Sequence, residues 1–314
     1  MLNFYKTDSG ILSEVSDSLD GVWVRMVNPT MEESRRIANM YNVDLADVRA
    51  ALDDEESSRV ELEDGYTLIL VDIPFDEVRN NRNAYTTIPL GIIITKEAII
   101  TICSENTVVL SLFVNNGVKG FSTKKRIRFV YQILFRTASV YQAYLRDINK
   151  RRSQIETGAI GGTTEDTDLI DLHELESNLV YFATSLNANR VVLERLTRYE
   201  RIEQYQDDKE LLDDVIVENR QAIDMTNIYR DILRGTRELL STMINNRLNN
   251  TMKFLTSITL VMAIPTIISG VYGMNVSGDW MPLSSTPYGF FIICAMIVVI
   301  CITALLILKR RKML

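Results

Sequence analysis

The stretch that decides the fold is Gly270-Val271-Tyr272-Gly273-Met274-Asn275, at the far end of a long apolar run. Between Lys253 and Lys309 the one charged side chain is that of Asp279. A polar segment over residues 276–287 divides this region into two uncharged runs. Each run is close to the ~20 residues that a helix needs to cross the hydrocarbon core of a membrane. The sequence therefore predicts two transmembrane helices, with the quoted stretch at the mouth of the first.

One face of the first predicted span carries small and polar residues, apart from one methionine. Its positions follow in alternating steps of three and four, the spacing of one helix face. They are Asn249, Met252, Thr256, Thr259, Ala263, Thr266, Gly270 and Gly273. Small residues are typical of seams where membrane helices pack closely. In a symmetric ring of chains the same stripe would line an axial pore, and its hydroxyl groups at membrane depth favour the pore.

Composition limits the classes of partner and reaction. The chain has 314 residues and a formal charge of −7 at pH 7. An acidic balance excludes nucleic acid, which needs basic surface to displace phosphate counterions, and suits hard cations held by oxygen ligands. The three cysteines form no disulfide or zinc motif. No nucleophile-base pair, paired-carboxylate motif or organic-cofactor loop indicates an enzyme.

The distribution of basic residues predicts the topology. The loop between the spans has no Lys or Arg, whereas Lys309-Arg310-Arg311-Lys312 follows the second span directly. The positive-inside rule places such a tail in the cytosol, and two spans return the N-terminus to the same side. The beginning of the chain does not resemble a signal peptide. We therefore expect a two-span protein of the cell membrane, in contact with lipid, with both termini cytosolic.

The soluble part is predicted to be an α+β domain followed by long helices. Thr30 and Glu33 have capping-box spacing before a helix, and five runs alternate like strands. The strand-like runs are 21–27, 59–62, 66–73, 87–94 and 98–103. No proline occurs between Leu90 and Ile264, which favours extended helices. We place these helices over about 124–156, from about 168 to 203, and from about 211 without a stop signal to 272.

The expected organisation has six segments. They are an N-terminal cytosolic α/β domain (1–120), a cytosolic helical hairpin region (121–210), a long stalk helix that continues into the first transmembrane helix (211–275), an extracellular loop (276–287), a second transmembrane helix (288–308) and a basic cytosolic tail (309–314).

The residues at the mouth resemble a family signature. Tyr272-Gly273-Met274-Asn275 precedes Met281-Pro282, a second span and a basic tail, all behind a large soluble domain. This arrangement resembles the CorA family of divalent-cation channels over essentially the whole chain. The resemblance implies a funnel-like homo-oligomer, a pentamer, whose first spans surround the pore. The positions that match the family's pore lining are Asn249, Met252, Ala263, Thr266, Gly273 and Asn275.

The chain departs from the family pattern at two places. Relatives have a bulky apolar constriction at the position of Ala263, so the narrow gate is expected to be wider or to lie lower, around Met252 and Leu255. Relatives also follow Met-Pro with Glu-Leu, whereas Leu283-Ser284 stands here. Asp279 is then the one acid of the outer loop. It either concentrates cations at the mouth, as a ring of charge would, or is a solvated turn residue.

The stripe has no carboxylate, which favours passage of a hydrated ion. Mg²⁺ gives up its water reluctantly, so amides, hydroxyls and carbonyls can hold its coordinated waters. Asn275 is expected to form the selectivity ring, with the Gly273 carbonyl nearby and with Tyr272 and Met274 orienting the turn. The membrane potential, worth about 4.6 kcal/mol per 100 mV for a divalent ion, would drive uptake.

The resemblance also implies a stop signal, in which cytosolic Mg²⁺ binds acids between neighbouring subunits. The matching positions are Asp214 on the stalk helix and Asp76 just after a strand, with Asp72, Asp213 and Glu218 as helpers. A bound cation would neutralise their repulsion and close the ring. Two alternatives stay open: a relative that moves Zn²⁺, or chiefly Co²⁺ or Ni²⁺, and a two-span adaptor that senses metal without conducting.

Overall fold

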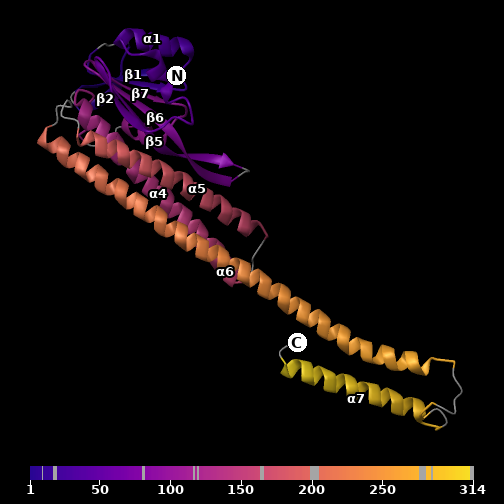
Figure 1. The fold of residues 1–314 in the computed structure, drawn as a ribbon. Helices are drawn as coiled ribbons and strands as arrows, with labels where there is room; N and C mark the ends of the chain where they lie inside the picture. Colours follow the sequence, from indigo (N-terminus) through magenta and orange to yellow (C-terminus); the bar gives the residue numbers. More distant parts are fainter. Residues whose placement is uncertain are drawn as a thin grey trace. The chain divides into compact units, whose positions relative to one another are not determined.

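The chain folds into two compact units, residues 1–237 and 238–314. The structure is a computed structural model (Figure 1). It describes residues 1–8, 10–16, 20–79, 82–115, 117–118, 120–162, 166–198, 205–275, 281–283 and 286–311. One helix, α6 (Gln206–Tyr272), belongs to both units.

The first unit is built on a mixed sheet with strand order β2-β1-β3-β7-β6-β5-β4. Neighbouring strands are antiparallel except β3 and β7, which run parallel. The strands are β1 (Leu2–Asp8), β2 (Ile11–Glu14), β3 (Val22–Val27), β4 (Arg59–Leu62), β5 (Tyr66–Arg79), β6 (Arg82–Thr95) and β7 (Ala98–Cys103).

Helices cover both faces of the sheet (Figure 1). On one face, α1 (Met31–Tyr41) and α2 (Leu45–Ala50) pack on a core that includes Val24 of β3. On the other face, Trp23 of β3 packs in a core shared with α3 (Val108–Val114), α4 (Arg126–Ile160), α5 (Asp166–Leu196) and the beginning of α6. Alternate side chains of a strand point to opposite faces, which explains why β3 and β7 are apolar on both sides.

Several sequence expectations are confirmed in the first unit. The capping box of α1 is present, because Thr30 Oγ1 accepts a bond from the Glu33 N–H and the Glu33 carboxylate accepts one from the Thr30 N–H. The α+β class and the long helices are as expected.

The segments predicted as a domain (1–120) and a helical hairpin region (121–210) share one hydrophobic core.

Several elements and element boundaries differ from the expectation. β1, β2 and α3 were not predicted, because short half-buried elements have weak periodicity. α5 ends at Leu196 rather than near 203, and α6 begins at Gln206 rather than near 211. The first turn of α6 contains Asp207 and Asp208, acids that favour a helix N-terminus through the helix dipole but that lie before the predicted start of this helix.

The β5–β6 hairpin extends well past the predicted strands. Its ladder runs from Tyr66 paired with Thr95 to Arg79 paired with Arg82. Asp76 was expected just after a strand, but it lies within β5 opposite Tyr85. The extension rests on α4, where the rings of Tyr85 and Tyr144 stack with centroids 4.5 Å apart. Tertiary packing therefore continues the strand through a segment that local sequence would end.

Candidate functional site

The second unit contains two apolar helices that the rest of the chain leaves exposed. Both α6 and α7 (Gly289–Arg310) are long and apolar enough to cross a membrane. In the most apolar 18-residue stretch of each helix, the rest of the chain buries 11% of α6 and 6% of α7. A core helix of a soluble protein would be mostly covered. Such exposed apolar surface needs lipid or further protein as its surroundings.

One face of α6 packs against α7. Ser257 is 1% exposed, and Cys301 Sγ of α7 lies 3.9 Å from the Val261 carbonyl oxygen. Ile264 and Ile268, close to Val261 around the helix, are half-buried. These residues mark the side of α6 that faces α7.

The predicted stripe lies on the other side of α6. At about 100° per residue, its positions centre roughly opposite Val261. Thr256, Thr259, Thr266 and Gly270 are exposed, and Ala263 is half-buried. The stripe is therefore not the seam between α6 and α7 of one chain.

Two threonine hydroxyls of the stripe, those of Thr259 and Thr266, donate their protons to backbone carbonyls of their own helix. Thr259 Oγ1 donates to the Leu255 carbonyl at 2.9 Å, and Thr266 Oγ1 donates to the Met262 carbonyl at 3.0 Å. The proton of each hydroxyl is used locally, so its oxygen keeps lone pairs that can accept a hydrogen bond. Acceptors of this kind suit the waters around a cation.

The mouth of the stripe is the last turn of α6. The Gly273 N–H donates to the Ser269 carbonyl at 2.9 Å, and the Met274 N–H donates to the Val271 carbonyl at 3.3 Å. A Cβ at Gly273 would lie 3.2 Å from the Ser269 oxygen, tighter than ordinary contact. Asn275 follows, exposed.

A side chain ties this turn to the following loop. Tyr272 Oη donates to the Pro282 carbonyl at 3.0 Å. This bond links the Tyr-Gly-Met-Asn motif at the end of α6 to the Met-Pro motif of the loop. Residue types alone did not indicate this bond, because its acceptor is a backbone oxygen. Asp279, the predicted outer acid, lies outside the described residues.

The predicted regulatory acids lie on separate elements of the first unit. Asp76 Oδ1 of β5 accepts a 2.8 Å bond from Tyr144 Oη of α4. Asp214 is exposed on α6. Among the residues that the structure describes, no group of three or more His, Cys, Asp or Glu side chains could hold a metal ion. A metal centre that uses both acids would need ligands from beyond a single chain.

Two of the predicted helper acids have partners within the chain. Glu218 Oε2 accepts a 2.6 Å bond from Gln142 Nε2. Burial raises the pKa of the Asp72 carboxyl above its usual range, while hydrogen bonds from Ser185 and Ser58 act in the opposite direction. The Asp72 backbone is also held by Asn189, which accepts from its N–H at 2.9 Å and donates to its carbonyl at 2.7 Å. Asp72 thus joins β5 to α5.

Comparison with known proteins shows which family shares this arrangement. The family model described as CorA-like Mg2+ transporter protein matches residues 18–310. The chain belongs to this family. The cobalt/magnesium transport protein CorA of Methanocaldococcus jannaschii is 30% identical over 297 residues, which cover 92% of this chain and 90% of the relative. The magnesium transport protein CorA of Helicobacter pylori is 24% identical over 93% of this chain and 89% of its own length.

Solved structures agree with the CorA fold over both units. The complete structure of the CorA magnesium transporter from Methanocaldococcus jannaschii superposes with a TM-score of 0.80 at 26% identity, covering 99% of this chain and 98% of the other. The full-length CmaX protein has a TM-score of 0.70 over 99% of this chain; at 17% identity it shows the fold alone. Membership of the CorA family, with two exposed apolar helices, makes this chain a membrane protein.

Proposed function

We propose that a homo-oligomer of this chain, a pentamer, forms a passive channel that imports hydrated Mg²⁺ into the cytosol. Co²⁺ and Ni²⁺ are the further cargo of the same pore. The chain lies in the cell membrane, with both termini cytosolic and residues 276–287 outside. The membrane potential drives the ion inward. The proposed activity is transport and not catalysis.

The observation that carries this proposal is the position of the stripe. Polar side chains on a membrane helix are costly toward lipid, and the threonines of the stripe lie opposite the face that packs on α7. Symmetric copies would cover the stripe by turning it toward a common axis. Such a ring gives five copies of each threonine acceptor around the ion.

The geometry of the stripe favours a hydrated ion. Thr259 and Thr266 offer oxygen lone pairs, and Asn275 offers an amide oxygen at the mouth. Neutral oxygens bind coordinated water without holding a divalent ion as tightly as carboxylates would. Asn275 is the selectivity ring of the proposal, the Gly273 carbonyl assists it, and Tyr272 orients the turn through Pro282.

Shut-off by cytosolic Mg²⁺ is the second half of the proposal. Asp214 is exposed on α6, the helix that also carries the stripe. Asp76 is exposed at the surface of β5 and is oriented by Tyr144. Mg²⁺ bound between Asp76 of one subunit and Asp214 of the next would hold the ring closed, and loss of the ion would release it.

A flux assay tests the pore. Purified protein is placed in liposomes that contain a Mg²⁺-sensitive dye, and influx is measured under an inside-negative potential. Asn275→Ala is expected to lower the initial Mg²⁺ rate at least tenfold. The control is Thr303→Ala on α7, which removes a hydroxyl bonded to its own helix and is expected to leave the rate unchanged. Equal flux in wild type and Asn275→Ala would reject the pore.

The same assay separates the alternatives. A channel for hydrated ions passes Mg²⁺ and is slowed by competing Co²⁺ or Ni²⁺. A Zn²⁺-transporting relative would carry Zn²⁺, and adding Mg²⁺ would not change the signal of the Mg²⁺-sensitive dye. A metal-sensing adaptor would give no flux with any of these ions, although it would still bind them.

A further inference from the structure

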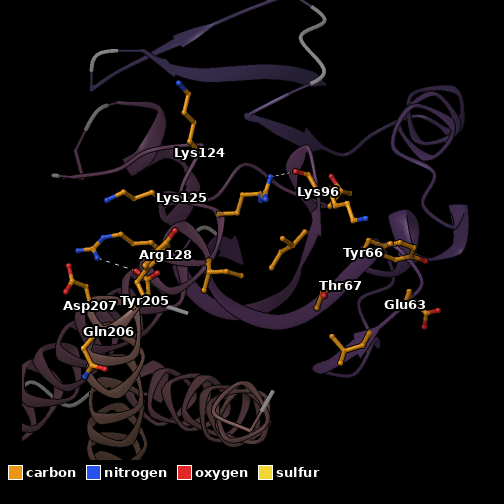
Figure 2. A pocket seen from close by; sticks show the side chains of 17 residues that line it. Glu63, Tyr66, Thr67, Lys96, Lys124, Lys125, Arg128, Tyr205, Gln206 and Asp207 are labelled. Carbon is orange, nitrogen blue, oxygen red and sulfur yellow. Dashed lines mark hydrogen bonds and ion pairs between the residues drawn. The ribbon is translucent and has the colours of Figure 1, made fainter. Parts of the chain in front are cut away.

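The first unit has a cavity of about 1060 Å³ beside the starts of α4 and α6 (Figure 2). Basic and acidic side chains line it together, and one such pair, Arg128 and Asp208, lies 3.3 Å apart. A lining of mixed charge does not select one class of ligand. The second unit has a more specific set of contacts, where the outer loop meets the ends of both apolar helices.

Two consecutive carbonyl groups of this loop bind different helices. The Pro282 carbonyl accepts a 3.0 Å bond from Tyr272 Oη at the end of α6. The Leu283 carbonyl accepts a 2.9 Å bond from Thr286 Oγ1 and a 3.4 Å bond from the Thr286 N–H. The Thr286 carbonyl in turn accepts a 3.1 Å bond from the N–H of Gly289, the first residue of α7. The loop is therefore tied to the last turn of one helix and the first turn of the other.

The backbone at Leu283 has an uncommon conformation. Its φ is +65°, and the other described non-glycine residues with positive φ are Asn28 and Asn42. Asparagine adopts this region much more readily than most other residues. A strained residue keeps such a conformation only where its surroundings hold it. Here the bonds to the carbonyls of residues 282 and 283 supply that hold.

Gly289 allows the loop to come this close to α7. A Cβ at this buried glycine would lie 2.0 Å from the Leu283 carbonyl oxygen and 2.8 Å from Thr286 Oγ1. The first of these atoms belongs to the backbone, so a side chain would push the loop away. A Cβ at Gly270 of α6, by comparison, would meet nothing within 4 Å. The loop contact, rather than the helix, therefore requires glycine at position 289.

We propose that Thr286 and Gly289 are positioning residues for the pore mouth. They hold the loop so that its Pro282 carbonyl meets Tyr272, and this bond fixes the turn that precedes Asn275. The inference rests on the proposed channel, in which Asn275 forms the selectivity ring. Because the two residues act through the loop, their loss should loosen the mouth and reduce the discrimination between ions.

Hydrogen exchange of the full-length protein in detergent tests the link between loop and mouth without any flux. Thr286→Val removes the hydroxyl and is expected to speed amide exchange in the peptide over residues 267–275 by about threefold. Thr286→Ser keeps the hydroxyl and should exchange as wild type. The control is Thr303→Ala, which removes a hydroxyl elsewhere on α7. Unchanged exchange in Thr286→Val would overturn the proposal.

Ion flux tests the effect on discrimination. Influx of Mg²⁺ and of Ca²⁺, a larger ion with more flexible coordination, is measured in liposomes with a dye for each ion. Gly289→Ala and Thr286→Val are each expected to lower the ratio of Mg²⁺ to Ca²⁺ influx by about threefold. Ala295→Val, at an exposed position of α7, is the control and should keep the ratio.

The outcomes separate this inference from the proposed channel. Normal flux in wild type with an unchanged ratio in Thr286→Val would overturn the positioning role and leave the pore standing. Wild type that carries neither ion would reject the channel and with it the role in discrimination, and hydrogen exchange would still test the link. Circular dichroism and elution volume show whether Gly289→Ala folds and assembles. Thr286→Val, a smaller change, carries the test if it does not.

A double-mutant cycle tests the path through Tyr272. Tyr272→Phe removes the bond to the Pro282 carbonyl from the other side and is expected to lower the ratio as Thr286→Val does. The double variant Tyr272→Phe/Thr286→Val should then be no worse than the stronger single variant, because both changes break one connection. Effects that multiply would show that the two residues act independently and would contradict the proposed path.

Discussion

At the scale of single residues, Asp72 is an acid that the fold holds at a cost. Its raised pKa, caused first by burial, means that the folded chain keeps the proton to a higher pH than the unfolded chain does. The free energy of unfolding therefore falls as the pH rises from the ordinary Asp pKa to the raised pKa of the folded chain. Above the raised pKa the loss of stability is complete. Asp72 at neutral pH is accordingly destabilising.

Asp72→Asn removes this cost, because an amide stays neutral and can still accept from Ser58 and Ser185. At neutral pH we expect a gain in stability, measured as a higher Tm. The gain should shrink as pH falls through the raised pKa. Thermal unfolding of both proteins at several pH values measures it, with the exposed Asp213→Asn as control. A larger gain at acid pH than at neutral pH would contradict this account.

Residue types in the sequence predicted some of the site but not its connections. The spacing of Thr259 and Thr266 indicated one helix face, and the structure places that face opposite α7. The bond from Tyr272 to the Pro282 carbonyl depends on how a loop returns, which composition does not encode. Asp76 was misplaced for a related reason, since β5 continues by pairing with β6, whose Tyr85 stacks on Tyr144 of α4, and local sequence does not show these contacts.

At the scale of elements, the proline in α6 explains one contact between the two apolar helices. Pro265 has no N–H, so the Val261 carbonyl lacks its helical donor four residues on. Cys301 Sγ of α7 lies 3.9 Å from that same oxygen. In a membrane a neighbouring helix can satisfy a carbonyl freed in this way. The proline and the cysteine should therefore depend on each other.

A double-mutant cycle measures this dependence. Cys301→Ala is expected to lower stability in detergent, but less so in a Pro265→Ala background, where residue 265 supplies the missing N–H. The coupling should be about 0.5 kcal/mol, typical of interhelical hydrogen bonds in membranes. Strictly additive effects would show that the sulfur only fills space.

Sequence patterns predicted long elements better than short ones. The end of α6 at Tyr272 agrees with the prediction, because Gly273 and the polar segment interrupt the apolar periodicity there. The beginning of α6 was missed by about one turn, since Asp207 and Asp208 are acids in either a loop or a first helical turn. β1 and β2 owe their pairing to β3, and such long-range contacts are not visible in a local window.

At the scale of the whole molecule, the proposed shut-off would depend on acids that the described residues of one chain do not bring into a metal site. If Asp214 binds Mg²⁺ between subunits, Asp214→Ala should keep conducting at millimolar internal Mg²⁺, where wild type closes. Internal Mg²⁺ is varied in the liposome assay, and the ratio of open to closed flux is compared. Glu210→Ala, another acid near the start of α6, is the control. Normal closure of Asp214→Ala would remove this residue from the mechanism.

The central claim is that the stripe of each chain faces a common aqueous axis. Thiol labelling during Mg²⁺ flux tests it most directly, in a background where Cys103, Cys294 and Cys301 are replaced. A water-soluble methanethiosulfonate reagent is expected to block flux through Thr266→Cys. It should leave flux through Ile258→Cys, which lies off the stripe, unchanged. Block through Ile258→Cys with none through Thr266→Cys would place the stripe away from water and contradict the account.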